Sequence, residues 1–559
     1  MPATLRRMTK LPLLFAALPA VALAQATPHF DPARLSHHVE ILASDAFEGR
    51  APATPAEAKT IDYVVGQLKA AGAQPGGDLK NGQRAWTQDV PLLHTSIAGA
   101  PSLTITSNGT AIPLTQGNQI ALRAALTGDK HISLKDVPII FVGYGVTAPE
   151  RNWDDFKGLD VRGKLLVMLV NDPDFETGPD VKNGGDFGGK AMTYYGRWTY
   201  KFEEAARRGA AGVLIVHETA PAAYGWATVK NSNTNDMFDI VRADPRATHP
   251  SFESWIQRDL AVKLFADSGL DFDAMKKAAQ SRDFKPVPLK ASLSADYDVN
   301  VATIVSHNIV GRIAGSKYPD ETLIYSAHWD HLGVGAPDAK GDRIYNGAVD
   351  NADGISVLLE MARAFASGPK PARSVVFLAV TAEERGLLGS EYYGANPLYP
   401  LATTVGMLNT DALSTAGPAR DFSISGTAKL GLLDDLIDEG RKQGRSFVPD
   451  AHPEAGSFYR SDHFTLAKRG VPAISIESGE DLVEGGRAAG LAWREAYTRD
   501  KYHQPADEWT PAWNATGQAV DAELLFSLGQ RLANGREWPN WSADSEFRGE
   551  RDKTAAVRK

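Results

Sequence analysis

Between residues 308 and 477, short apolar runs bounded by turn residues alternate with a helical pattern. The runs are 308–313, 322–327, 374–381, 405–409 and 473–477. A clean amphipathic helix, 355–365, lies between the second and third runs and ends before Gly368. Alternation of this kind is typical of a mostly parallel sheet with helices on both faces. The sequence therefore predicts an α/β fold for this region, with 522–532 as its final helix.

Residues that commonly bind metals stand where several of these runs end. His328, Glu384 and Asp411 each follow an apolar run. Because the carboxyl ends of parallel strands meet at one edge of a sheet, we expect these three side chains to lie close together. Asp350 lies in the loop that opens the amphipathic helix, and His503 lies in a loop before the last helix.

Two histidines and three carboxylates suit two zinc ions that share one carboxylate. Glu383 stands beside one of these residues and is free to take a proton from water. Each residue alone has a simpler interpretation: Asp350 is a good helix cap, and the Glu383-Glu384 pair is a solvated acidic pair. Two adjacent carboxylates at the end of an apolar strand are nevertheless costly without a counter-charge. The whole set, in this order, favours a metal site.

The motif series around these residues resembles that of the co-catalytic di-zinc peptidases. The segments are His328-Trp329-Asp330, Asp350-Asn351-Ala352-Asp353-Gly354, Glu383-Glu384-Arg385-Gly386-Leu387-Leu388-Gly389-Ser390, Asp411 and Tyr502-His503. That family includes secreted bacterial leucyl-type aminopeptidases, glutamate carboxypeptidases and the transferrin receptor ectodomain. The resemblance covers about 308–535 and implies a phosphorylase/hydrolase-like zinc peptidase fold, with a mixed, mostly parallel sheet sandwiched by helices.

Carried over residue by residue, the resemblance implies a ligand set for two zinc ions. One ion would be bound by His328 and Asp411, and the other by Glu384 and His503, with Asp350 bridging. Carboxylate-rich sites also accept cobalt or manganese, so zinc is an expectation from ligand type.

The same resemblance implies roles for two further carboxylates. Glu383 would act as general base and then give its proton to the leaving amine. Asp330 would accept the far N–H of His328 and hold its tautomer.

Three further segments have a functional and a structural interpretation. Residues 460–463 resemble the serine-aspartate-histidine stretch that lies near the substrate pocket in the family, which makes Ser461 and Asp462 candidates for substrate binding; a helix cap is the alternative. Tyr459 is the nearest candidate for a tyrosine that polarises the scissile carbonyl. Asp507 either orients the loop that carries the second histidine or caps a helix.

A second unit precedes the catalytic part. Residues 131–295 are predicted to form an inserted, β-rich domain and its connection, because Gly143-Tyr144-Gly145 and the segments near 161–164 and 204–216 resemble a protease-associated domain. Such a domain would border the cleft and restrict substrates, or pack without touching them. The stretch 219–295 is poorly periodic and predicts surface structure.

The remaining boundaries follow from composition. Residues 25–130 are expected to be the N-terminal part of the peptidase domain, and 296–540 its catalytic part. The tail 541–559 is charged and lacks an apolar face, so we expect disorder there.

The N-terminus predicts export. Arg6, Arg7 and Lys10 precede an apolar run, 11–23, and Ala22-Leu23-Ala24 supplies a small-residue cleavage site, so 1–24 is expected to be a signal peptide. The run is shorter than the roughly 20 residues of a membrane-spanning helix. The chain has no cysteine, so it forms no disulfide and carries no cysteine-linked lipid. We expect a bacterial periplasmic or extracellular protein.

Net charge and motifs together limit the function. A net charge of −9 and the lack of a basic stripe argue against a nucleic-acid partner. The resemblance, together with the N-terminal signal, implies a secreted zinc exopeptidase that acts on peptides, and among its secreted relatives an aminopeptidase is the first expectation. A carboxypeptidase or dipeptidase is the alternative, and it would use an arginine for the substrate carboxylate, with Arg460 and Arg499 as candidates. A non-catalytic receptor-like ectodomain and a single-zinc glutaminyl cyclase are more remote.

Overall fold

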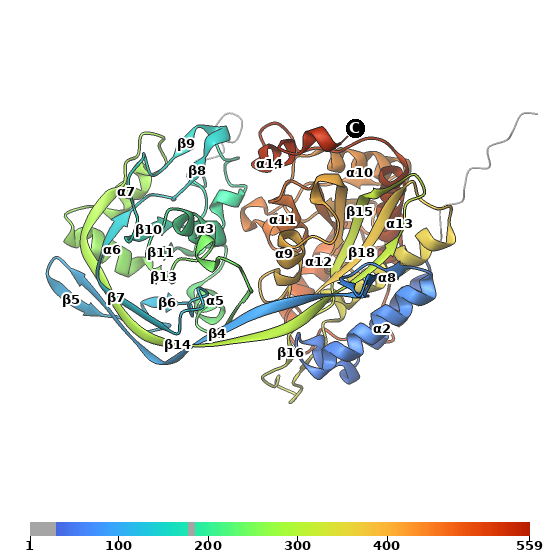
Figure 1. Cartoon of the computed structure of the whole chain (residues 1–559), viewed down its shortest axis with the longest axis horizontal. Helices are drawn as coiled ribbons and strands as arrows, with labels where there is room; N and C mark the ends of the chain where they lie inside the picture. Colours follow the sequence, from blue (N-terminus) through green and yellow to red (C-terminus); the bar gives the residue numbers. More distant parts are fainter. Residues whose placement is uncertain (1–29, 177–184, 559) are drawn as a thin grey trace, which may run out of the picture.

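The computed structural model describes residues 30–176 and 185–558, so the expected signal peptide lies outside the described residues. Two lobes share one 16-stranded sheet, with strand order β21-β20-β22-β19-β15-β18-β14-β7-β10-β11-β13-β6 along its main path. Figure 1 shows the lobes side by side, with two long strands running beneath both. The fold is mixed α/β, as the sequence predicts.

The catalytic lobe has a parallel centre. Strands β15 (Tyr318–His328), β18 (Arg373–Val380), β19 (Thr404–Thr410) and β22 (Ala473–Ser478) pair in parallel. Strand β14 (Val287–Ile313) pairs antiparallel with β18. On the other side β20 (Asp421–Ile424) pairs antiparallel with β22, and β21 (Ser446–Phe447) extends the edge. Every residue of β18 is buried, which is why this strand is an unbroken apolar run.

Helices cover both faces of this part of the sheet (Figure 1). On one face α8 (Asp353–Ser367) packs against α1 (Pro32–Leu42), α2 (Pro55–Ala71) and α13 (Thr516–Asn534). On the other, α9 (Leu388–Ala395) packs against α11 (His463–Ala467). The sequence sets the ends of α2, since Pro55 occupies its first turn and Gly72 ends it at a φ of 93°. This lobe also contains α10 (Gly431–Lys442) and α12 (Gly486–Asp500).

The second lobe is also α/β. Strands β7 (His131–Phe141), β10 (Leu165–Leu169), β11 (Gly212–His217) and β13 (Phe252–Gln257) are parallel, and β6 (Ile120–Leu122) closes the edge antiparallel. Its helices are α3 (Trp198–Arg207), α4 (Thr219–Ala222), α5 (Trp226–Asn233), α6 (Arg258–Asp267) and α7 (Phe272–Ala278). The expectation of mere surface structure over 219–295 is therefore wrong, because β13 and α6 contribute buried residues to the core of this lobe.

Two long strands join the lobes. Strand β4 (Thr87–Ser107) pairs antiparallel with β14 along nearly its whole length, and the short strand β12 (Met237–Ile240) pairs with β4. Leu103 and Ile105 of β4 belong to the core of the second lobe, which therefore starts well before residue 131. The predicted boundary at 131 is wrong, because a single uninterrupted strand passes from one lobe into the other and leaves no linker.

The C-terminal tail is ordered up to residue 558, and the expectation of disorder from 541 is wrong. Trp541 and Arg551 are each 2% exposed, and α14 (Arg548–Asp552) lies on the catalytic lobe. Arg551 Nη2 donates to the carbonyl of Thr404 at 2.9 Å. A few buried anchors among many charged residues hold the segment, and average composition does not reveal them.

No helix among the described residues is both long enough and apolar enough to cross a membrane.

Replacing Trp541 by alanine tests whether the tail stabilises the catalytic lobe. Trp541 packs against Phe547, with ring centroids 5.0 Å apart, and its indole N–H donates to the carbonyl of Gly470 at 3.1 Å. Trp541→Ala should lower the free energy of unfolding by about 3–5 kcal/mol, measured by urea denaturation. The matched control, Val557→Ala at a 55% exposed position, should change it by less than about 0.5 kcal/mol. Equal stability of both variants would contradict an anchoring role.

Candidate metal centre

The parallel strands bring the expected residues to one edge of the sheet. β15 ends at His328, β18 is followed by Glu383 and Glu384, and β19 is followed by Asp411. Tight turns aim these side chains: the residue before Glu383, Ala382, has a φ of 52°, and left-handed φ costs a non-glycine residue about 1–2 kcal/mol. Such local strain is common at functional sites.

Asp350 lies at the centre of the cluster. Its Oδ1 atom is 3.2 Å from Nε2 of His328, and its Oδ2 atom is 3.2 Å from Nε2 of His503. His328 Nε2 also lies 3.3 Å from Oδ1 of Asp411, and His503 Nε2 lies 3.2 Å from Oε2 of Glu384. The structure therefore brings all five predicted ligands together, in two groups that share Asp350.

These distances fit the donor set of two zinc ions. Zinc bonds to nitrogen and oxygen are about 2.0–2.1 Å, so two ligands at a tetrahedral angle are separated by about 3.3–3.4 Å. The four N···O distances of 3.2–3.3 Å match that separation. Groups whose ligand atoms all lie within 4.8 Å are His328-Asp350-Asp411 and His331-Asp350-Glu384. The residues present can thus hold two divalent cations.

The carboxylates of the cluster need positive charge beside them to be stable in their ionised form. Burial raises the pKa of Glu383 well above its usual range; Glu384 and Asp411 act in the same direction, while His328 opposes them. Burial alone would lower the pKa of His503, but Asp350 and Glu384 raise it to about 9. So many carboxylates in one buried site are stable only with cations or protons between them.

Asp330 supports the cluster differently from the prediction. The Nδ1 of His328 is 3.0 Å from the main-chain carbonyl oxygen of Asp330, whereas the nearest carboxylate oxygen is 3.8 Å away. The Asp330 carboxylate instead accepts the backbone N–H of Glu383 at 3.0 Å and that of Glu384 at 3.4 Å. The turn after β15 brings the main-chain carbonyl of Asp330 back toward the ring of His328. The carboxylate of Asp330 is therefore free to hold the backbone of the two glutamates.

Asp507 fixes the loop that carries the shared carboxylate. It is buried and accepts the backbone N–H of Val349 at 3.1 Å and of Asp350 at 3.1 Å. The helix-cap interpretation of Asp507 is wrong, because α13 begins only at Thr516.

Arg50 was not among the predicted site residues. Its buried guanidinium donates to four main-chain carbonyl oxygens: those of Leu42 at 2.7 Å, Trp329 at 2.9 Å, Asn346 at 2.6 Å and Gly347 at 2.7 Å. Burial lowers its pKa to about 10, against the opposing effect of Asp507 and other carboxylates, so it is charged at neutral pH. No sequence pattern signals such a role, because all four acceptors are backbone atoms.

His331 is a second residue that the sequence reasoning missed. It is 1% exposed, and its Nδ1 lies 2.6 Å from Oε1 of Glu384. Its ring also packs edge-on against His503, with centroids 5.7 Å apart. The signal was present in the sequence, since His331 stands three residues after His328. His331 either adds a ligand to one group or positions Glu384.

The structure separates the three candidates for substrate binding. The Ser461 hydroxyl donates to Oδ2 of Asp411 at 2.6 Å, so it holds a candidate ligand. Asp462 is buried and accepts from the Ser390 hydroxyl at 2.6 Å, away from the cavity. Tyr459 lines the cavity, and its hydroxyl donates to Oε1 of Glu546 at 3.1 Å.

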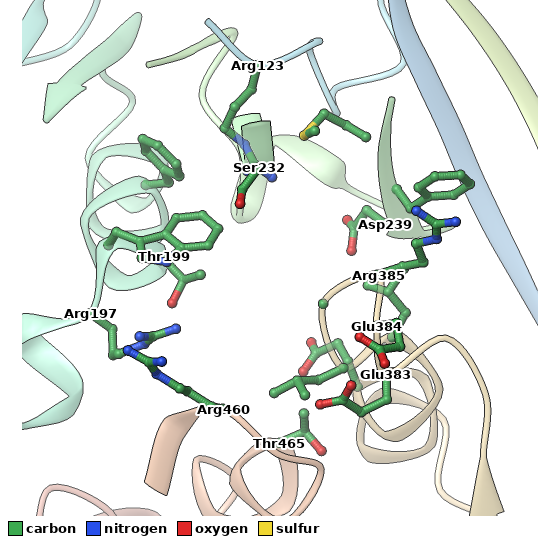
Figure 2. A pocket seen from close by; sticks show the side chains of 18 of the residues that line it. Arg123, Arg197, Thr199, Ser232, Asp239, Glu383, Glu384, Arg385, Arg460 and Thr465 are labelled. Carbon is green, nitrogen blue, oxygen red and sulfur yellow. The ribbon is translucent and has the colours of Figure 1, made fainter. Parts of the chain in front are cut away.

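A cavity of about 560 Å³ opens in front of Glu383, Glu384 and His503. Both lobes line it, with Arg197 and Thr199 from the second lobe facing Glu383 from the catalytic lobe in Figure 2. Cavities of this size typically bind small molecules or a few residues of a peptide.

Replacing Arg50 by lysine tests its role in holding the cluster. A lysine keeps the charge but does not reach four carbonyl groups in fixed directions. Arg50→Lys should weaken zinc binding by about 10- to 100-fold, measured by competition with a chromophoric chelator. The matched control is Arg34→Lys in α1, whose side chain is 43% exposed and should leave zinc affinity unchanged. Wild-type affinity in Arg50→Lys would show that the loops hold their positions without this arginine.

Part of the chain is similar in sequence to known proteins. Residues 308–526 match the family described as Peptidase family M28. A "Probable zinc metalloprotease" of Pyricularia oryzae is 33% identical over 113 residues, 20% of this chain and 22% of that protein. Another of the same description, from Pyrenophora tritici-repentis, is 34% identical over 120 residues, 22% of this chain and 26% of that protein. The chain thus spans about a quarter of these relatives.

Among solved structures, an aminopeptidase from Aneurinibacillus sp. strain AM-1 is 18% identical with a TM-score of 0.47, covering 91% of this chain and 95% of that chain. The zinc aminopeptidase BSAP from Bacillus subtilis is 17% identical with a TM-score of 0.42, covering 94% of this chain and 100% of that chain. The region that matches the family holds all five predicted ligands and Glu383. Residues 308–526 therefore form a domain of peptidase family M28.

Proposed function

We propose that this protein is a zinc-dependent exopeptidase and that, of the possible exopeptidases, it is an aminopeptidase. Its substrate's scissile peptide bond would lie beside the carboxylate of Glu383. The observation that carries the proposal is the arrangement of Asp350, whose two oxygens each lie 3.2 Å from a different histidine. Glu383 lines the cavity beside this arrangement. A carboxylate within reach of two groups of candidate metal ligands, with a second carboxylate free beside them, would suit metal-assisted activation of water.

The residues of the chain divide the chemistry among them. His328 and Asp411 would hold one zinc, Glu384 and His503 the other, and Asp350 would touch both. Bound zinc supplies Lewis acidity, which lowers the pKa of water and polarises a carbonyl oxygen.

Glu383 would take a proton from the attacking water and deliver it to the leaving nitrogen. The backbone bond from its N–H to Asp330 keeps its main chain in place during that exchange.

Further observations support the choice of reaction and substrate. The sequence relatives described as zinc metalloproteases support peptide hydrolysis. The cavity has the size of a few peptide residues, which supports short substrates or chain ends. The motif series resembles that of secreted bacterial aminopeptidases, which supports the N-terminal end. The positively charged N-terminus with its apolar run and small-residue site supports export.

One observation favours a second candidate, a carboxypeptidase or dipeptidase. Arg460 lines the cavity, and it has no ion-pair partner among residues 30–176 and 185–558. Arg499, the other arginine suggested by the sequence, is paired with Asp500 at 2.6 Å and is 68% exposed outside the cavity, so it does not serve this purpose.

Metal removal and paired glutamate variants test the mechanism. Dialysis against a chelator should abolish hydrolysis, and two equivalents of zinc per chain should restore it. Glu383→Gln should keep both zinc ions, measured by elemental analysis, and lose about 10²- to 10⁴-fold in kcat. Its matched control, Glu384→Gln, should lose one zinc. The assigned roles would be wrong if Glu383→Gln turned over at the wild-type rate.

A substrate panel tests which chain end is cut. Aminoacyl-p-nitroanilides with a free N-terminus should release nitroaniline, and N-acetylated peptides with a free C-terminus should remain intact when followed by mass spectrometry. Release of C-terminal residues from the blocked peptides would instead select the carboxypeptidase.

A further inference from the structure

Most cations around the cavity are matched by carboxylates. Arg123 of the second lobe is 2.9 Å from Glu253, and Lys468 of the catalytic lobe is 3.2 Å from Glu203. Arg242 lies 2.7 Å from Asp239 and 3.2 Å from Glu391. Arg385 is exposed and lies against the ring of Phe238, 5.1 Å from its centroid. Because these side chains already have partners within the protein, they do not need a ligand to balance their charge.

Arg197 and Arg460 differ from these cations because their side chains are unpaired within the described part of the chain. Among residues 30–176 and 185–558, neither side chain has a hydrogen bond or an ion pair to a protein group, and Nε of Arg197 is buried without a partner. Both line the cavity, and Figure 2 shows their guanidinium groups close together on the side that faces Glu383.

This pairing is electrostatically unfavourable in the protein by itself. Burial lowers the pKa of Arg197 to about 10, and the charge of Arg460 acts in the same direction. Arg197 is nevertheless charged at neutral pH. Two like charges without a counter-ion, one of them half-buried with its Nε atom out of reach of solvent, cost stability, and local conflicts of this kind are typical of binding sites. An anion between the two guanidinium groups would relieve this conflict.

The position of the pair relates it to the reacting bond. Arg460 directly precedes Ser461, whose hydroxyl is 2.6 Å from the Asp411 carboxylate in the candidate metal cluster. The side chain of Arg460 lines the same cavity as Glu383, so an anion held there would share the cavity with the reacting bond. Arg197 directly precedes α3, so the second lobe supplies the other half of the site.

We propose that Arg197 and Arg460 together form a subsite for a substrate carboxylate. Guanidinium groups bind carboxylates through paired, charge-assisted hydrogen bonds, which suits two such groups facing one cavity. The carboxylate is either the free C-terminus of a very short peptide or an acidic side chain beside the scissile bond. The inference rests on the proposed peptidase function and adds that its substrates are anionic near the cut.

Matched substrate pairs distinguish the sources of the carboxylate. Leu-Gly and Leu-Gly-amide differ only in the C-terminal charge. Glu-p-nitroanilide and Gln-p-nitroanilide differ in the side chain before the scissile bond, and Leu-Glu-amide and Leu-Gln-amide differ in the side chain after it. With the zinc-loaded full chain, the charged member of at least one pair should be preferred by about 10- to 100-fold in kcat/KM.

Variants then assign that preference to the two arginines. Arg460→Gln and Arg197→Gln should each bring the charged-to-uncharged ratio of kcat/KM close to one, and Arg460→Lys should keep part of it. Arg460 is exposed, so its replacement leaves the packing of the core intact. The matched control is Arg162→Gln, an arginine of the second lobe that is 79% exposed and paired with Asp160, and it should keep the wild-type ratio.

The outcomes separate this inference from the proposed function. Hydrolysis of the uncharged members without any preference would overturn the carboxylate subsite and leave the peptidase standing. A preference that survives in both glutamine variants would also overturn it. If no member of any pair is hydrolysed by the zinc-loaded chain, the peptidase proposal fails and the subsite fails with it.

Discussion

The candidate metal centre depends on one buried cation. The guanidinium of Arg50 is bonded to carbonyl groups from the end of α1, from the turn after β15 and from the loop that carries Asp350. The end of α1 lies about 300 residues before the other two segments in the chain, and each of the three contributes to the surroundings of the carboxylate cluster. Arg50 therefore supplies both directed hydrogen bonds and positive charge beneath a site that is otherwise acidic. Asp507 holds the same loop through the opposite kind of hydrogen bond, because its carboxylate accepts two of the loop's N–H groups.

The strand ends of the catalytic lobe were the most predictable part of the molecule. Buried parallel strands are apolar runs, and the residues that follow them must meet at one edge, so the proximity of His328, Glu384 and Asp411 followed from pattern alone. The ligand roles of these residues and of His503 remain predictions that metal analysis will decide. Arg50 was not predictable in the same way, because it recognises only main-chain atoms.

Other features escaped prediction for physical reasons that differ. The lobe boundary was placed too late because β4 keeps its strand character across the junction, with Leu103 and Ile105 already in the second core. The tail was expected to be disordered because its charges outnumber its anchors, yet Trp541 and Arg551 hold it. Local composition averages over a window, whereas anchoring needs only one or two side chains that find a pocket.

The antiparallel pair of long strands β4 and β14 runs through both lobes and links them across the cavity (Figure 1). Side chains of a strand alternate between faces with a period of two residues. Inserting or deleting two residues in both strands would therefore shift the outer lobe by about 7 Å and leave every inward-facing side chain inward. A change of one residue would turn both faces over. The length of this strand pair can thus change in steps of two residues, which would widen or narrow the cleft without rebuilding either core.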